Sequence, residues 1–140
     1  MPAETFVADK HFTVTTDRRR SIIDITDTVA ELLREMDMDA GLVCISVPHC
    51  TCCLYVNENE AGLLEDTLLL LDNIGGRGNW RHDRIDNNAD AHLCASLVGN
   101  SVTLPVRAGH MQLGTWQRIM LVELDGPRTR HVTITAIGAA

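Results

Sequence analysis

The sequence lacks the long apolar run that a membrane-spanning helix needs. Such a helix takes about 18 or more apolar residues in succession, whereas the longest apolar cluster here, residues 68–71, is bounded by Asp66 and Asp72. The first residues also lack the basic and apolar segments of a secretory signal. We therefore expect a protein that has no membrane partner and works in the cytoplasm.

An excess of positive charge is also missing. The chain has 12 Lys and Arg against 19 Asp and Glu, a net charge of −7. This balance disfavours nucleic acid as a partner, because non-specific binding to phosphates draws on basic residues. A small anionic ligand held by a few local donors stays compatible with it. The length of 140 residues and the hydrophobic content of 45% indicate one globular domain, residues 1–140.

The cysteines give only weak evidence for a metal site or a redox site. They stand at positions 44, 50, 52, 53 and 94, and an odd number cannot pair completely within one chain. His49 beside Cys50, Cys52 and Cys53 has the ligand types of a zinc site. In a strand, however, Cys50 and Cys52 share a face while Cys53 points the other way. Free, partly buried thiols are the favoured interpretation, ahead of a zinc site or a thiol redox centre.

Strand and helix patterns alternate along the chain. Residues 11–15, 22–25, 42–47 and 52–56 are typical of strands, the third so apolar that we expect it to be buried on both faces. Apolar residues at 29, 32, 33 and 36 predict an amphipathic helix that Gly41 ends. A second helix is predicted over 60–74, a polar loop over 79–89, and a third helix over 91–98, capped by Asn88 or Asp90.

Three more strands, over 102–106, 118–124 and 130–136, complete the pattern, with a turn at Asp125-Gly126-Pro127-Arg128. The order β-β-α-β-β-α-α-β-β-β predicts an α+β domain with a mixed or antiparallel sheet.

Histidines and amides provide the first candidate site. If the third helix begins near Asn88, Asn88 and His92 lie four residues apart on one face of it, and His82 precedes them in the loop. Converging imidazoles there could bind a divalent metal or transfer protons. A purely structural role for each histidine is the alternative.

Three other segments have two interpretations each. The segment Asn57-Glu58-Asn59-Glu60 either caps the next helix, or its Asn57 and Glu58 orient a ligand. Glu123 follows a strand that is apolar on both faces and should therefore be central and buried. It is then either the partner of an arginine (Arg107, Arg128 or Arg130) or a catalytic group. Trp116 and Gln117 end the segment 109–117, which contains the glycines Gly109 and Gly114, and they supply either a stacking surface and an amide or a structural plug.

The motifs, taken in order, resemble one family. They are His49-x-Thr51, Asn57-Glu58, His82-Asp83, Asn88-Ala89-x-Ala91-His92, Gly109-x-x-x-Leu113-Gly114-Thr115-Trp116-Gln117 and Glu123-x-Asp125-Gly126-Pro127-Arg128-x-Arg130. This series is similar to the YjbQ family from about Lys10 to Gly138. The segments Leu-Gly-Thr-Trp-Gln and Asp-Gly-Pro-Arg are its most specific parts. After His49 the family usually reads Thr-Thr-Ala, where this chain has Cys50-Thr51-Cys52.

The resemblance implies an α+β fold, a homotrimer and a secondary thiamine-phosphate synthase activity. That reaction joins a pyrimidine methyl pyrophosphate to a thiazole phosphate and releases pyrophosphate. It would make a phosphorylated small molecule the partner. The size of the domain favours a site between subunits.

Under this hypothesis the catalytic candidates are His82, Asn88 and Glu123. The candidates for substrate binding are Asn57, Glu58, Trp116, Gln117, Arg128 and Arg130. His49, His82 and His92 would hold a divalent ion, zinc or magnesium. The alternative is a non-catalytic protein that binds a metal or a ligand with the same histidines.

Overall fold

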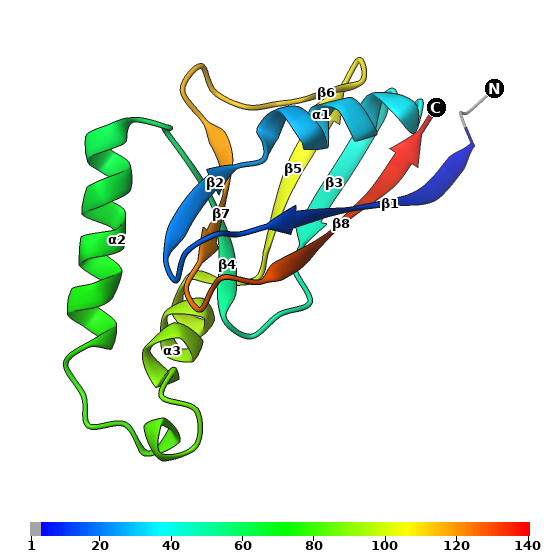
Figure 1. The fold of residues 1–140 in the computed structure, drawn as a ribbon. Coiled ribbons are helices and arrows are strands. Elements are labelled where there is room, and N and C mark those ends of the chain that lie inside the picture. Colours follow the sequence, from blue (N-terminus) through cyan, green and yellow to red (C-terminus); the bar gives the residue numbers. More distant parts are fainter. Residues whose placement is uncertain (1–3) are drawn as a thin grey trace.

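The chain folds into two antiparallel sheets with helices packed on them (Figure 1). The structure, a computed structural model, describes residues 4–140. The helices are α1 (Thr26–Glu35), α2 (Ala61–Gly75) and α3 (Ala89–Val98), with a short 3-10 helix, η1 (Arg81–Arg84), before α3. The strands are β1 (Thr5–Thr15), β2 (Ser21–Asp24), β3 (Ala40–Ser46), β4 (Cys52–Asn57), β5 (Ser101–Arg107), β6 (His110–Met111), β7 (Arg118–Glu123) and β8 (Thr129–Ala139). The α+β class and the predicted element order are confirmed, with β6 as an addition.

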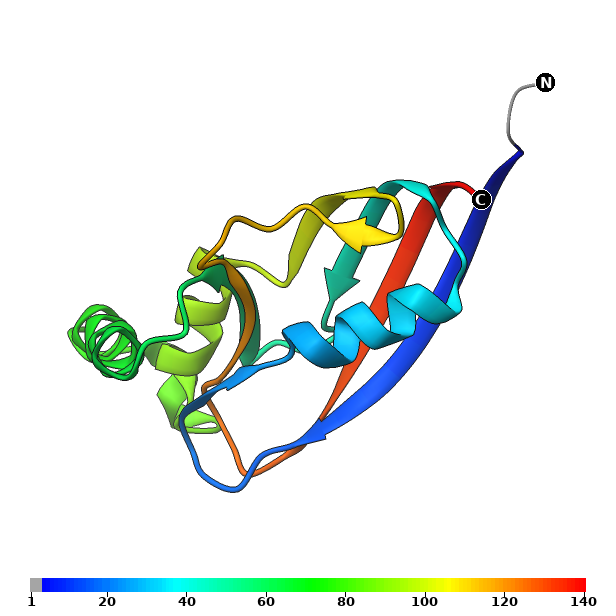
Figure 2. The ribbon, with the colours of Figure 1, turned by 90° about the horizontal axis from the view of Figure 1, so that it is seen from above.

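The larger sheet has the strand order β1-β8-β3-β5-β6. Its first two strands pair along their whole length. Helix α1 lies over one face of this sheet (Figure 2), where Val29 and Leu33 pack with Ile134 in the main hydrophobic core. The apolar spacing that predicted this helix therefore corresponds to its buried face.

The smaller sheet, in the order β2-β7-β4, positions the candidate site. Strand β7 is central and is buried from Ile119 to Glu123. Leu121 faces the main core, whereas Val122 faces a second apolar cluster that includes Leu71 of α2 and Ala91 of α3. The prediction that this strand, apolar on both faces, is central and buried is confirmed.

Gly41 corrects one prediction. It lies inside β3, directly opposite Gly138 of β8, and not at a helix end. A Cβ atom on Gly41 would stand 2.2 Å from the carbonyl oxygen of Ile137, so only glycine permits the two backbones to approach this closely. Helix α1 ends earlier, and Asp37, with φ of 56°, supplies the left-handed turn into β3.

Strand β3 is also less buried than predicted. Val43 and Ile45 are inaccessible to solvent, but Leu42 is 48% exposed. Helix α1 covers only one face of the large sheet (Figure 2), so alternate side chains remain near solvent. Within residues 4–140, no helix is long and apolar enough to cross a membrane.

Candidate active site

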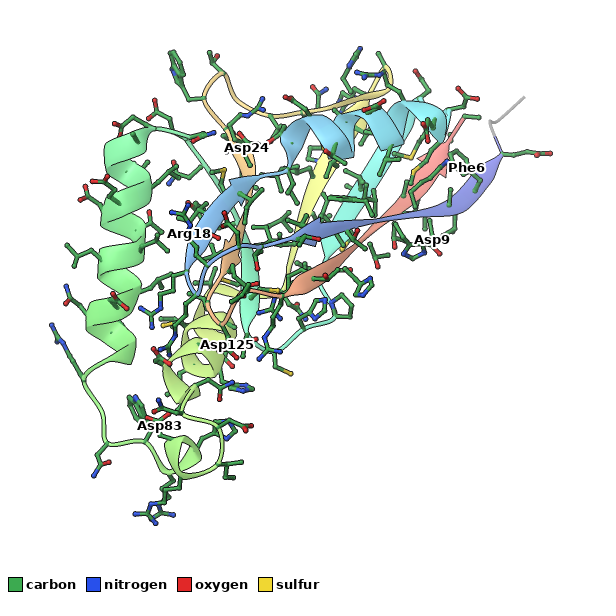
Figure 3. The ribbon with its side chains drawn as sticks, in the orientation of Figure 1. Phe6, Asp9, Arg18, Asp24, Asp83 and Asp125 are labelled. Atoms are coloured by element: carbon green, nitrogen blue, oxygen red, sulfur yellow. The ribbon has the colours of Figure 1, made fainter. Side chains whose placement is uncertain are left out.

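The predicted site residues gather where β4 begins and β7 ends. Cys52, the first residue of β4, pairs with Glu123, the last residue of β7. The loop before β4 carries His49, and the turn after β7 carries Asp125. Figure 3 shows Asp83 and Asp125 toward the α3 side of the molecule, and Asp24 toward the other end of the small sheet.

A buried ion pair anchors this region. Glu123 is fully buried and Arg130 is 3% exposed. Arg130 Nε donates to Glu123 Oε1 at 2.9 Å, and Arg130 Nη2 donates to Glu123 Oε2. Glu123 also accepts from Thr16 Oγ1 at 2.8 Å and from the backbone N–H of Asp125 at 3.0 Å. Burial raises the pKa of Glu123, but these hydrogen bonds outweigh it and hold the pKa below its usual value.

The pair is therefore an internal element of the fold. Of the alternatives for Glu123, partnership with an arginine is the one that the structure contains, and the arginine is Arg130. Arg130 directs its remaining contacts to the carbonyl oxygen and hydroxyl of Thr51, at 3.0 and 2.8 Å. A guanidinium buried in this way is not available to clamp a dissolved phosphate, and Glu123 is not available to touch a substrate.

His82, Asn88, Asp125 and Arg128 form a continuous series of hydrogen bonds. His82 Nε2 lies 3.0 Å from Asn88 Oδ1, and Asn88 Nδ2 donates to Asp125 Oδ2 at 2.8 Å. Arg128 Nη2 donates to the same oxygen at 3.0 Å, and its Nε donates to the Asp125 carbonyl at 2.7 Å. Burial raises the pKa of Asp125, but the bonds from Asn88 and Arg128 more than compensate and keep it below its usual value.

Asn88 does not act as the cap that the sequence predicts. It stands at the position before α3, yet its side chain accepts no bond from the first turn. Asp83 Oδ1 accepts instead from the backbone N–H of Ala89, at 2.9 Å. The Asn88 side chain is thereby free to join His82 to Asp125.

His92 lies between two hollows. The first, of about 310 Å³, is lined by His49, Cys50, Cys52, His92, Ala95, Ser96, Gly99 and Asn100. The second, of about 370 Å³, is lined by Trp80, Arg81, His82, Ala89, His92 and Leu93. The ring centroids of His82 and His92 are 4.7 Å apart, and the two ring planes meet at 72°. The three candidate histidines therefore surround adjoining hollows. The spacing of Asn88 and His92 predicted the convergence of His82 and His92, but not the position of His49.

His49 is held as a neutral imidazole. The backbone N–H of His131 donates to His49 Nε2 at 2.8 Å, and the two rings stack 5.8 Å apart. Burial lowers the pKa of His49, and the charges of Arg130 and His131 lower it further, against the opposing effect of Glu123. Because Nε2 accepts a hydrogen bond, the neutral ring carries its proton on Nδ1.

The three histidines do not form a three-ligand metal site. Among the described residues, no group of three or more His, Cys, Asp or Glu is placed to hold a metal ion. A catalytic zinc takes three protein ligands, but His49 accepts a hydrogen bond at Nε2 and so carries its proton on Nδ1, which leaves this ring no lone pair for a metal. This donor set therefore does not fit a zinc or magnesium ion held jointly by His49, His82 and His92.

The other predicted binding residues lie at the far end of the small sheet. Asn57, the last residue of β4, pairs with Arg118, the first of β7. At about 3.3 Å per residue, this end is some 16 Å along the strand from Cys52. Glu58 and Trp116 line a separate hollow there, of about 370 Å³.

The side chains of two of these residues accept hydrogen bonds from backbone N–H groups of their own turns. Asn57 Oδ1 accepts from the backbone N–H of Glu58, and Gln117 Oε1 accepts from that of Gly114. Glu60 caps α2 by accepting from Gly62 and Leu63. The capping interpretation of this segment is thus confirmed at Glu60, and one small ligand cannot touch both ends of the sheet in one chain.

The cysteines are free thiols, as expected. Burial raises the pKa of Cys52 to about 11 and that of Cys53 to about 12, so both are protonated at neutral pH. Cys50 and Cys52 line the first hollow, where the family pattern has other residues. The small thiol side chains of Cys50 and Cys52 form part of the wall of this hollow.

Two site residues were missed from the sequence. Asp125 had been assigned only to a turn, and its partner Asn88 is 37 residues away. Arg81 lies in the polar loop and lines the hollow beside His82 and His92. Its position next to His82 in the chain was the one available signal.

Comparisons with known proteins agree with the observed fold. Residues 10–139 match the family described as "UPF0047 protein YjbQ-like". A UPF0047 protein of Archaeoglobus fulgidus is 50% identical over 127 residues, which cover 89% of this chain and 98% of the relative. The UPF0047 protein YugU of Bacillus subtilis is 35% identical over 133 residues, covering 92% and 98%.

Solved structures give the same result. A YbjQ-like protein of unknown function from Sulfolobus solfataricus has a TM-score of 0.94 at 39% identity, covering 96% of this chain and 99% of that one. A hypothetical protein from Aeropyrum pernix has a TM-score of 0.90 at 41% identity, covering 94% and 98%. The chain therefore belongs to the YjbQ (UPF0047) family.

Proposed function

We propose that this chain is an enzyme that acts on a phosphorylated small molecule at the two hollows that meet at His92. The observation that carries the proposal is the fixation of two histidines beside these hollows. His49 and His82 each engage the protein through Nε2, which leaves the other ring nitrogen of each for a ligand.

Histidines held in this way are suited to proton transfer. Imidazole changes its charge near neutral pH, and a positioned acid or base contributes about 10²–10⁴-fold to a rate. Neutral His49 can donate from Nδ1 to a phosphate oxygen that gains charge as its bond breaks. Together with His82 and His92 it supplies donors and an acceptor around one bound molecule.

Arg81 supports an anionic substrate. Its side chain is exposed and lines the hollow with His82 and His92. Among residues 4–140 it forms no ion pair, so its guanidinium is available for a bidentate contact with phosphate. Arg128 is 52% exposed but already holds Asp125, so it serves the site indirectly.

The reaction to test first is the formation of thiamine phosphate. In it, the nitrogen of a thiazole phosphate forms a bond to the methylene carbon of a pyrimidine methyl pyrophosphate, and the carbon–oxygen bond to pyrophosphate breaks. The leaving group gains negative charge as it departs. A cationic arginine and imidazole donors stabilise that charge.

The experiment compares the wild type with His82→Ala, His92→Ala and His110→Ala. His110 is an exposed histidine of β6, remote from the hollows, and is the matched control. We expect product from the wild type and from His110→Ala, and a fall in kcat of at least about 100-fold in His82→Ala. If the wild type binds the substrates but forms no product, the proposed enzyme activity is refuted and a non-catalytic binding protein is favoured.

The proposal includes a homotrimer in the cytoplasm. Five free thiols are typical of a reducing compartment. Apolar side chains exposed on α2 and α3 are surfaces that another copy could cover; they are Leu69, Leu70, Ile74, Leu93 and Leu97. Sedimentation should give three times the mass of one 15.4 kDa chain, and a monomeric mass would refute the assembly without refuting the activity.

A further inference from the structure

We infer that Asp125 is a positioning residue that fixes the tautomer of His82 and leaves Nδ1 as the ring nitrogen that exchanges a proton with the ligand. The role of that proton rests on the proposed function. The tautomer itself depends only on the hydrogen bonds around the ring, so it can be tested without any reaction.

The direction of each bond follows from Asp125. An ionised carboxylate only accepts, so the Asn88 atom 2.8 Å from Asp125 Oδ2 must be the donating amide nitrogen. The Asn88 oxygen then faces His82 Nε2, at 3.0 Å. Because that oxygen only accepts, Nε2 must carry a proton, and the lone pair of the neutral ring lies on Nδ1.

Asp125 is itself held rigidly. Arg128 binds both its carboxylate and its carbonyl oxygen. Its backbone N–H donates to Glu123, which is locked in the interior by Arg130. The carboxylate that orients Asn88 is therefore connected to the core, and this gives the buried ion pair an effect on the site that involves no contact with substrate.

The surroundings of Asn88 and His82 remove the competing arrangements. Asp83 caps α3, so Asn88 is not drawn into capping. The planes of the His82 and His92 rings meet at 72°, with the ring centroids 4.7 Å apart, so His92 packs against the His82 ring. When His82 accepts a proton at Nδ1, the bond from Nε2 to Asn88 stays in place, so a cycle of proton uptake and release leaves the series of bonds intact.

The test is ¹⁵N NMR of the histidine side chains in the full-length protein. The nitrogen shifts distinguish the two neutral tautomers of His82. We expect the wild type to show only the form protonated on Nε2. In Asp125→Ala, the Asn88 amide is free to reverse and donate to Nε2, so both tautomers should appear. Asn88→Ala should give the same mixture while leaving the Asp125–Arg128 contact in place.

Asp9→Ala is the matched control, because Asp9 lies on β1, far from this site (Figure 3), and accepts a side-chain hydrogen bond from Thr135 of β8. It should leave His82 unchanged. A wild-type ring protonated on Nδ1, or an unchanged single tautomer in both Asp125→Ala and Asn88→Ala, would overturn the inference. A fixed tautomer in a protein that forms no product would refute the proposed function and leave this inference standing.

Discussion

Replacing Glu123 with glutamine tests whether the buried ion pair stabilises the fold. The carboxylate accepts hydrogen bonds from Arg130, Thr16 and Asp125. In Glu123→Gln, one acceptor oxygen becomes an amide donor that faces other donors, and the Arg130 charge is left uncompensated. Breaking a buried pair in this way costs about 3–5 kcal/mol, a large part of the roughly 5–15 kcal/mol that stabilises a domain.

The assay is urea unfolding at neutral pH, with the free energy extrapolated to water. Glu58→Gln, a half-buried carboxylate at the other end of β4, is the control and should change stability by less than about 0.5 kcal/mol. A Glu123→Gln protein with unchanged stability and no turnover would refute the structural role and point to direct chemistry.

A double variant sharpens the test. Glu123→Leu combined with Arg130→Met removes both charges, and apolar replacement of a buried pair is often neutral or stabilising. The double variant should be more stable than Glu123→Leu alone or Arg130→Met alone, although Thr16 and Thr51 each lose a hydrogen-bond partner in it. Losses that simply add would show that the two side chains are not coupled.

Two further variants test the fold and its pH dependence. Burial raises the pKa of Asp24, but hydrogen bonds, with that from Arg118 foremost, lower it from 3.8 to about 2. A depressed carboxyl pKa contributes stability above the unfolded value, here about 2 kcal/mol, that is lost as pH falls from about 4 to about 2. Asp24→Asn should therefore be less stable at neutral pH and lack that fall, as unfolding at a series of pH values would show. Gly41→Ala should lose about 1–3 kcal/mol to the clash with the β8 backbone, whereas Gly62→Ala, whose added Cβ would stand 3.2 Å from the Glu60 carboxylate and meet no backbone of another element, should lose less.

Much of the fold was predictable because its patterns are local. The apolar spacing in α1 and the buried run in β7 identify their elements without knowledge of the partner. The division of the strands into two sheets was not predictable, since pairings such as β1 with β8 join opposite ends of the chain. Gly41 was misassigned because a glycine serves both a helix end and a close backbone approach.

The candidate site was predictable where its residues are close in sequence. The four-residue spacing placed His92 in the first turn of α3, just after Asn88, and the loop brings His82 back to both. Glu123 was expected to be buried, but three arginines were comparable partners, and only the fold, which places the end of β7 against the start of β8, selects Arg130. The role of Asp125 depends on a contact between two distant loops, which no local pattern reports.

The central claim is that a phosphorylated ligand binds at the hollows beside His92. The most direct measurement is an NMR titration of the isotope-labelled protein with a pyrimidine methyl pyrophosphate, following the histidine and tryptophan side chains. We predict that signals of His49, His82 and His92 shift with a common affinity while His110 does not move. A shift of the Trp116 indole with unmoved histidines would contradict the account and place the ligand at the other end of the small sheet.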